Sequence, residues 1–157
     1  MKYYHKKMKS PVGELKLIAS DNGLAGVLWE NDDPHPTGTS TSREDNDHPV
    51  LLEAEKQLAE YFEKKRTNFT LKLDFTGTDF QKKVWEALLT IPFGETRSYG
   101  QIAKQINNPK AVRAVGAAAN KNPISIVAPC HRVIGATGKL IGFGGGLENK
   151  SFLLELQ

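Results

Sequence analysis

Features typical of membrane, disulfide-bonded and zinc-binding proteins are scarce in this chain. A single cysteine among 157 residues excludes an internal disulfide and a zinc site built on several cysteines. The histidines other than His131 show no ligand spacing. No apolar run approaches the roughly 20 residues that span a membrane, and the N-terminus lacks the apolar core of a signal peptide. We therefore expect a cytoplasmic globular protein without a membrane partner, bound metal or cofactor.

Acidic residues are scarce in the second half of the chain. Residues 77–157 carry 10 Lys and Arg against 5 Asp and Glu, whereas residues 1–76 carry 11 against 13. The net charge of +3 therefore comes from the second half. A cationic region of this kind favours a polyanion as partner, although a solvated basic surface would give the same composition.

The N-terminal region has the pattern of β structure. Two apolar segments, 15–19 and 24–29, flank the turn signal Asp21-Asn22-Gly23 and predict a β-hairpin. Residues 31–49 are rich in Asp, Asn, Pro, Thr and Ser and hold almost no apolar residue, which predicts a mobile surface loop.

A helix and a further strand complete the first half. Apolar residues at helical spacing run from Leu51 to Phe62. Strict alternation of apolar and polar residues from Phe69 to Phe75 predicts a half-buried strand. The first half is thus predicted to be a small α+β domain, residues 1–76.

Three helices are predicted at the start of the second half. Thr78 with Gln81, and Ser98 with Gln101, each place a hydroxyl three residues before a glutamine, which is the pattern of a reciprocal capping box. Asn108 is the expected N-cap of the third helix, with Pro109 at its first position. A short helix, a tight turn and this third helix predict a helix-turn-helix, with these residues on the inner face of its third helix: Val112, Val115, Gly116 and Ala119.

The outer face of the third helix suggests contact with DNA that does not depend on base sequence. Its exposed stripe is predicted to contain Lys110, Arg113, Ala117 and Asn120. Alanines such as Ala114 cannot reach base edges in the major groove, but small residues let a backbone approach closely. Although alanine also simply favours helices, the lone arginine among them points to Arg113 as a probe of the minor groove.

The only cysteine follows an apolar segment, 124–128, which predicts a buried strand ending at Pro129-Cys130-His131-Arg132-Val133. A lone cysteine is usually a small inert apolar residue, but adjacent imidazole and guanidinium groups favour the reactive thiolate. The glycine-rich segment 142–146 lacks the spacing of a phosphate loop and is expected to form a wall against a flat ligand. An amphipathic helix is expected to end the chain.

These motifs resemble those of one family, the O6-alkylguanine-DNA alkyltransferases, also called methylated-DNA-protein-cysteine methyltransferases. The matching segments, in chain order, are Ser10-Pro11-Val12-Gly13, Gly77-Thr78-Asp79-Phe80-Gln81, Ser98-Tyr99, the run 108–116, Asn122-Pro123 and the run 129–135. The resemblance implies an α+β fold with a small ribonuclease-H-like domain, residues 1–76, and a winged helix-turn-helix domain, residues 77–157. It further implies a monomer whose partner is double-stranded DNA containing alkylated guanine.

The resemblance also implies the reaction. Cys130 would accept the alkyl group of O6-alkylguanine irreversibly, once per molecule, with O4-alkylthymine as a second candidate substrate. The base must be flipped, because O6 is paired inside the duplex. His131 would relay the thiol proton through a water, Asn122 would hold the turn that presents the thiol, and Arg113 would fill the gap in the stack. The remaining DNA- and base-binding residues implied are Tyr99, Ala114, Gly116, Arg132, Val133, Phe143 and Gly144.

The chain departs from the family pattern at two positions. Many members have tyrosine at the position of Phe143. The family's glutamate, which orients the histidine, aligns with Gln157, and an amide cannot stabilise an imidazolium as a carboxylate does. Glu155 is the nearby alternative, although about 200° around the helix separates it from Gln157.

Three other functions fit parts of the sequence. A Cys-His thiol hydrolase usually has its histidine far from the cysteine in sequence. An alkyltransferase-like protein that binds damaged guanine without repairing it would lack the cysteine, and a transcriptional regulator is disfavoured by the alanine-rich helix face. Hydrolysis with turnover, or binding to a specific operator, would support the first or the last.

Overall fold

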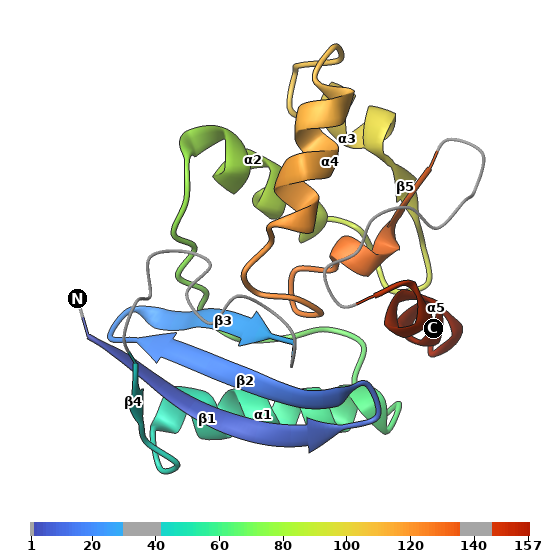
Figure 1. Ribbon diagram of the computed structural model, residues 1–157. Coiled ribbons are helices and arrows are strands. Elements are labelled where there is room, and N and C mark those ends of the chain that lie inside the picture. The colour runs from blue at the N-terminus through green and yellow to red at the C-terminus, as the bar shows by residue number, and fades with distance from the viewer. Residues whose placement is uncertain (1, 30–41, 136–145) are drawn as a thin grey trace. The chain divides into compact units, whose positions relative to one another are not determined.

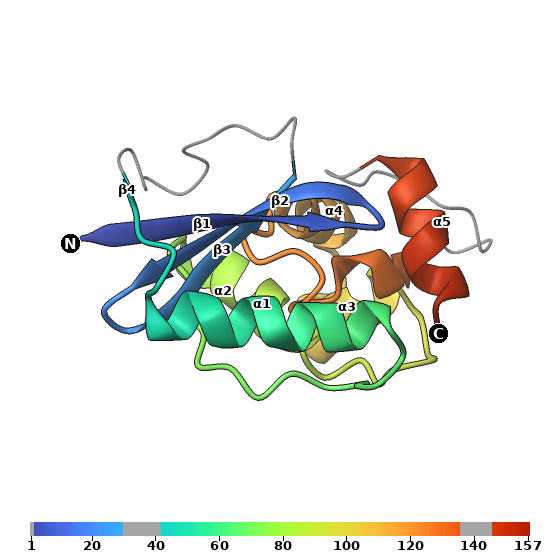
Figure 2. The same ribbon diagram turned by 90° about the horizontal axis from the view of Figure 1, so that it is seen from below.

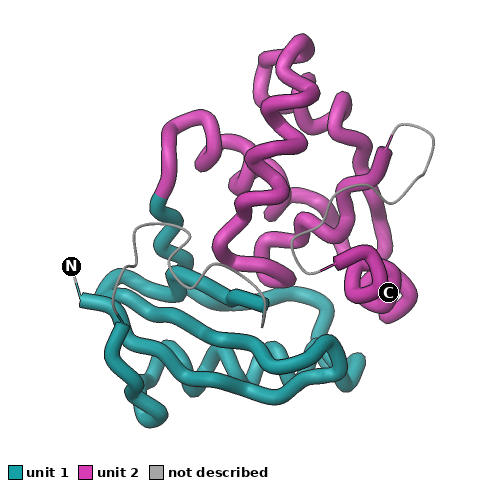
Figure 3. Tube along the Cα trace, viewed as in Figure 1, with its two compact units in different colours: residues 1–76 teal, residues 77–157 magenta. Residues whose placement is uncertain are grey.

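The computed structural model describes residues 2–29, 42–135 and 146–157. It divides into two compact units, residues 1–76 and 77–157, which Figure 3 colours separately. No helix in the described ranges is long and apolar enough to cross a membrane.

The first unit is built on a four-stranded sheet with the order β3-β2-β1-β4. Its strands are β1 (Tyr3–Ser10), β2 (Gly13–Ser20), β3 (Gly23–Leu28) and β4 (Arg43–Glu44). The predicted hairpin is confirmed, because β2 and β3 pair antiparallel across the turn. Gly23 has φ +145° there, and a Cβ on it would lie 2.5 Å from the Lys72 carbonyl oxygen. The turn therefore requires glycine.

One helix, α1 (Pro49–Phe62), covers one face of this sheet, as Figure 2 shows. The prediction of a helix here is confirmed. Its buried stripe contains Leu51, Ala54, Leu58 and Tyr61, which recur at intervals of three and four residues. The His48 side chain caps the helix by accepting from the Val50 amide at 3.2 Å.

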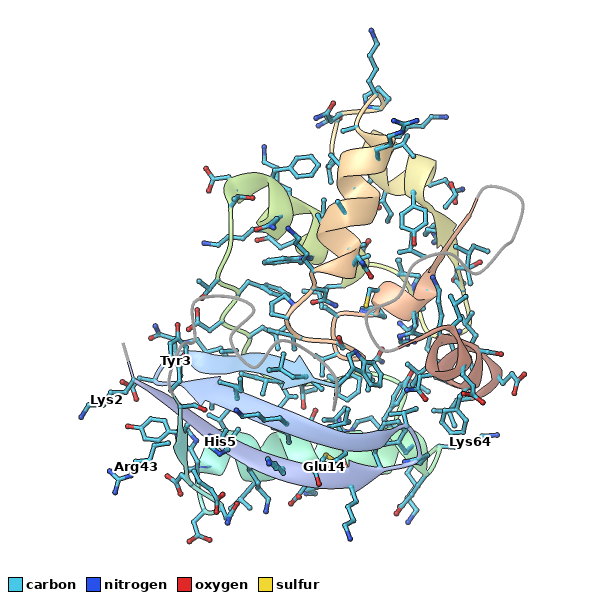
Figure 4. The ribbon with its side chains drawn as sticks, viewed as in Figure 1. Lys2, Tyr3, His5, Glu14, Arg43 and Lys64 are labelled. Carbon is cyan, nitrogen blue, oxygen red and sulfur yellow. The ribbon has the colours of Figure 1, made fainter. Side chains whose placement is uncertain are left out.

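Two predictions for the first unit need correction. Residues 31–41 of the expected loop lie outside the described residues, but Arg43 and Glu44 form β4, which pairs in parallel with Tyr4 and His5 of β1. Figure 4 labels His5 and Arg43 in these two strands. The predicted strand 69–75 is reduced to one bridge, Leu73 to Leu24. Alternation indicated the half-burial of this segment, but its ladder is limited to Leu24, whose amide donates to the Lys72 carbonyl at 2.8 Å and whose carbonyl accepts from the Asp74 amide at 2.7 Å.

Helices dominate the second unit. They are α2 (Asp79–Leu88), α3 (Tyr99–Gln105), α4 (Val112–Asn120) and α5 (Leu147–Glu155), and α4 packs against both α2 and α3 (Figure 1). Both predicted capping boxes are confirmed. The Thr78 and Ser98 hydroxyls each accept a hydrogen bond from the backbone amide of the glutamine three residues later, and the side-chain oxygen of that glutamine accepts from the backbone amide of the Thr or Ser. The buried core includes Val84, Trp85, Leu88, Ile102 and Val115.

The start of α4 differs from the prediction. The N-cap is Ala111, without a side-chain hydrogen bond, because Asn108 closes a turn instead: its carbonyl accepts from the Ala111 amide at 3.0 Å. Lys110 therefore precedes the helix. Val112, expected on the inner face, is 42% exposed.

Candidate active site

A buried turn delivers Cys130, where a strand was expected. The Val127 amide donates to the Ser125 carbonyl at 2.8 Å, across Ile126 at φ +74°. This is a γ-turn of the rare left-handed form, which a β-branched residue adopts only under constraint. A second γ-turn follows, because the Cys130 amide donates to the Ala128 carbonyl at 2.8 Å across Pro129 at φ −80°, ψ 68°. Cys130 then begins a 3₁₀ turn, η1 (Cys130–Arg132).

Asn122 holds this turn closed. Its side-chain amide nitrogen donates to the Ala128 carbonyl at 2.7 Å, and its side-chain oxygen accepts from the Ile124 amide at 3.0 Å. Both hydrogen bonds are buried. Because buried backbone groups need partners, one amide side chain stabilises both ends of the turn before Cys130.

Cys130 is buried, with 8% of its surface exposed, and two helices supply its titratable neighbours. Tyr99 begins α3, and its phenol pKa is raised by burial and further by the negative charge of the Cys130 thiolate. Lys150 lies in α5; burial lowers the pKa of its ammonium, and the Cys130 charge opposes that shift. The charge of Cys130 therefore acts on a phenol of α3 and on an ammonium of α5.

His131 is fully buried, and burial lowers its pKa to about 3, with further lowering by the charges of Arg132 and Lys150. A contact with the Gln157 side chain opposes this shift. Neither ring nitrogen has a hydrogen-bond partner among the described residues. The imidazole is consequently neutral at physiological pH.

Arg132 is bound inside the unit rather than exposed towards a ligand. Its guanidinium donates through Nη1 to the Ile91 carbonyl at 2.7 Å and through Nε to the Gln157 side-chain oxygen at 2.6 Å. It also lies 5.6 Å from the centre of the Phe93 ring. Arg132 was expected to bind DNA, but all of these contacts are to groups of the protein itself. Gln157 is thus placed at the site, whereas Glu155 is exposed.

Lys150 was not predicted from the sequence. It is 0% exposed, and its Nζ donates to the Val133 carbonyl at 2.5 Å. Val133 begins the two-residue strand β6 (Val133–Ile134), which pairs in parallel with β5 (Arg97–Ser98) just before Tyr99. The available signal was its spacing: Lys150 lies three residues from both Leu147 and Leu153, on the face expected to be apolar.

The outer face of α4 presents small side chains and one long one, as predicted. Arg113, Ala114, Ala117 and Asn120 are exposed, as is Lys110 before the helix. Gly116 faces the Tyr99 ring: a Cβ added to it would lie 3.8 Å from a ring carbon. Phe143 and Gly144 lie outside the described residues. Within the described parts of the chain, no three His, Cys, Asp or Glu residues gather as metal ligands.

Comparisons with known proteins agree on one family. Residues 3–75 match the ribonuclease-like domain, and residues 79–157 the DNA-binding domain, of 6-O-methylguanine DNA methyltransferase. The methylated-DNA–protein-cysteine methyltransferases of Mycobacterium leprae and Methanosarcina mazei are each 48% identical to this chain. The matches cover 97% and 99% of it, and 90% and 96% of those proteins.

Solved structures give the same result. The O6-methylguanine methyltransferase of Mycobacterium tuberculosis has a TM-score of 0.87 at 47% identity, over 98% of this chain and 92% of that one. The M. tuberculosis OGT in complex with DNA has a TM-score of 0.88 at 46% identity, over 99% and 92%. The predicted α+β fold, with a ribonuclease-like domain before a DNA-binding domain, is confirmed. The chain belongs to the 6-O-methylguanine DNA methyltransferase family.

Proposed function

We propose that this protein repairs DNA by transferring the alkyl group of O6-alkylguanine in duplex DNA to its own Cys130. Relatives that are nearly half identical over almost the whole chain are methylated-DNA–protein-cysteine methyltransferases. The observation that carries the proposal is the position of the only cysteine. It stands at the end of a turn closed by Asn122, where its charge acts on the phenol of Tyr99 and the ammonium of Lys150, in the domain that matches a DNA-binding family.

The transfer is a displacement at the alkyl carbon. The Cys130 sulfur forms a bond to that carbon, the carbon–O6 bond breaks, and its electron pair remains on guanine. The thiol loses one proton and the departing guanine gains one, so the net products are a thioether and ordinary guanine. Because a thioether is stable at neutral pH, each molecule reacts once and needs no cofactor.

The burial of Cys130 makes base flipping necessary. The thiol of a residue with only 8% exposure cannot reach a base that remains stacked in a duplex, so the base must enter the site. Arg113 is exposed on α4, one helical turn before Gly116, which faces Tyr99 of α3. We assign Arg113 to the vacated stack and Tyr99 to the flipped base. Small exposed residues such as Ala114 let the backbone of α4 approach the DNA.

His131 acts in this scheme as a neutral group. Its two buried ring nitrogens have no protein partner among the described residues, so they can bind a water between the imidazole and the thiol. A neutral imidazole accepts at one nitrogen and donates at the other, which suits it to relay a proton without storing one. Residues 77–157 would thus carry both the acceptor and the DNA-binding surface, with residues 1–76 as support, in a cytoplasmic monomer.

Intact mass measurement tests the proposal. The protein is incubated with a duplex containing O6-methylguanine, and one added methyl group located on Cys130 is expected. Cys130→Ser is the matched control and should remain unmodified while still binding the duplex. Continued turnover with the protein mass unchanged would contradict self-alkylation and favour a hydrolase. A second duplex containing O4-methylthymine tests the additional substrate.

A further inference from the structure

Lys150 carries its ammonium group in the protein interior, where burying a charge costs free energy. Its side chain is completely buried, although an ammonium removed from water loses several kcal/mol of hydration unless it is paired. The cost appears as the lowered pKa of this lysine, and the Cys130 charge opposes it. A buried ammonium of this kind is retained only where its surroundings compensate it.

A short chain of hydrogen bonds connects the ammonium to Cys130. Lys150 Nζ donates to the Val133 carbonyl, and the Val133 amide donates to the Cys130 carbonyl. Lys150 therefore holds the residue that closes η1, the turn on which the thiol stands. The Val133 carbonyl keeps a second lone pair, which remains available to an amino group such as that of guanine.

The charged groups around Cys130 single out Lys150. α2 also packs against η1, but its charged residues are not buried: Asp79, Lys82, Lys83 and Glu86. Tyr99, on α3, is neutral at physiological pH. On its own turn, His131 is neutral, and the Arg132 guanidinium is directed to Ile91 and Gln157. Of the described groups whose pKa responds to the Cys130 charge, only Lys150 is a cation.

We propose that Lys150 is a positioning residue for alkyl transfer. Its buried ammonium stabilises the Cys130 thiolate and fixes the carbonyl of Val133, the residue that closes η1. The proposal deepens the proposed function and rests on it. An ammonium near a thiolate favours ionisation of the thiol, so the thiol proton passes through the water and His131 to solvent before the displacement step, and the departing guanine then takes a proton from solvent. In this scheme Lys150 of α5 stabilises the negative charge of the thiolate, and His131 transfers the thiol proton.

The test measures thiol ionisation without DNA. The rate at which iodoacetamide alkylates Cys130 is followed against pH in the native protein, in Lys150→Met and in Lys83→Met. Methionine keeps the length of the lysine stem but removes its charge, and Lys83 is an exposed lysine on α2 that serves as the matched control. The midpoint should rise by about one pH unit or more in Lys150→Met, because an opposite charge nearby shifts ionisation by that amount. Lys83→Met should overlay the native profile.

A profile of Lys150→Met that overlays the native one, in a protein with a native circular dichroism spectrum, would overturn the proposal. Should Lys150→Met not fold, a reciprocal measurement keeps the lysine intact. Coupling between two ionising groups is mutual, so removing the thiolate must lower the pKa of Lys150. Carbon-13 NMR of the lysine side chains in Cys130→Ser should show that shift for Lys150, and an unchanged Lys150 titration would refute the pairing.

The outcome is separable from that of the proposed function. Methyl transfer from a DNA duplex tests the proposed function, whereas iodoacetamide reactivity and the lysine titration involve no DNA. If the native protein transfers the methyl group but Lys150→Met leaves the midpoint of the iodoacetamide profile unchanged, the proposed function stands and the role of Lys150 is refuted. If Lys150→Met changes that midpoint but the native protein transfers no methyl group, the role of Lys150 stands and the proposed function is refuted.

Discussion

At the residue scale, burial decides what His131 can do. The ordinary histidine pKa of 6.5 falls to about 3 in the folded protein, so the folded state resists protonation that the unfolded chain accepts. An imidazole with such a low pKa does not hold the thiol proton at neutral pH. The resemblance to the family indicated a histidine beside the cysteine, but only the packing of the second unit reveals its protonation state.

The lowered pKa of His131 predicts acid sensitivity. Between about pH 6.5 and pH 3 the unfolded chain binds one more proton at this residue, so stability is complete above pH 6.5 and falls as the pH drops through that window. The full difference between the two pKa values corresponds to a loss of stability on the order of 5 kcal/mol. Urea unfolding at a series of pH values should show this slope. His131→Gln, which cannot titrate, should flatten it, and equal slopes in both proteins would contradict the burial argument.

Gln157 offers a second prediction at this scale. Gln157→Glu places a carboxylate where the amide oxygen now accepts from Arg132 at 2.6 Å and contacts His131. The negative charge should raise the pKa of His131. The pH midpoint of single-turnover transfer should move down, with a faster rate near neutrality. NMR titration of the His131 ring and the transfer rate measure the two effects.

Glu155→Gln is the matched control for Gln157→Glu, because Glu155 is exposed near the same end of α5. It should leave both the histidine titration and the transfer rate unchanged. A sharp loss of rate in Glu155→Gln, with Gln157→Glu silent, would instead make Glu155 the orienting carboxylate. If Arg132 neutralised the new carboxylate of Gln157→Glu completely, the pKa of His131 would stay unchanged, which would contradict the prediction.

At the element scale, local sequence signals predicted what local interactions determine. The capping boxes at Thr78 and Ser98 need only residues three apart, and both form. The segment 124–128 was wrongly predicted as a strand, because an apolar run reports burial and not backbone geometry. Its γ-turn at Ile126 depends on Asn122, whose amide bonds a carbonyl six residues away. Lys150 was missed for a related reason, since its partners come from a different part of the second unit.

Removing the Asn122 amide should loosen the turn that presents Cys130. Asn122→Ala leaves the Ile124 amide buried without its partner and removes one of the two hydrogen bonds that the Ala128 carbonyl accepts, which costs about 2 kcal/mol of stability. Thermal unfolding measures that loss, and slower alkylation by iodoacetamide measures the displaced thiol. Asn120→Ala, at an exposed position on α4, should change neither quantity. Unaltered thiol reactivity in Asn122→Ala would show that the turn holds its shape without this side chain.

The exposed arginine of α4 gives a prediction for that helix. Arg113→Ala removes the side chain assigned to the vacated stack, so repair of O6-methylguanine in a duplex should fall by about tenfold or more. Reaction with free O6-benzylguanine should hardly change, because that substrate needs no flipping. Single-turnover rates on the two substrates provide the comparison. Equal losses on both would assign Arg113 to the folding of the domain.

At the scale of the whole molecule, charge is divided between the two units. Residues 77–157 carry 10 basic residues against 5 acidic ones, while residues 1–76 carry 11 against 13. The basic excess coincides with the unit that matches a DNA-binding family. Composition thus predicted the class of partner. The structure confirms that α4 exposes Arg113 and buries Val115, as the residue pattern of that helix predicted, while contact of Arg113 with DNA stays a prediction.

This division predicts how salt affects repair. Binding through phosphates releases counterions, so the logarithm of the binding constant falls linearly with the logarithm of salt concentration, by about 0.9 for each phosphate neutralised. Three exposed lysines, Lys104, Lys110 and Lys121, lie on α3 and at the two ends of α4, and Arg113 is assigned to the stack, so a slope of about −3 is expected for unmodified duplexes of any sequence. Fluorescence anisotropy at several salt concentrations measures it. The rate with free O6-benzylguanine should be nearly independent of salt. A flat binding curve, or strong preference for one sequence, would move recognition from the phosphates to the base edges and restore the transcriptional regulator as an alternative.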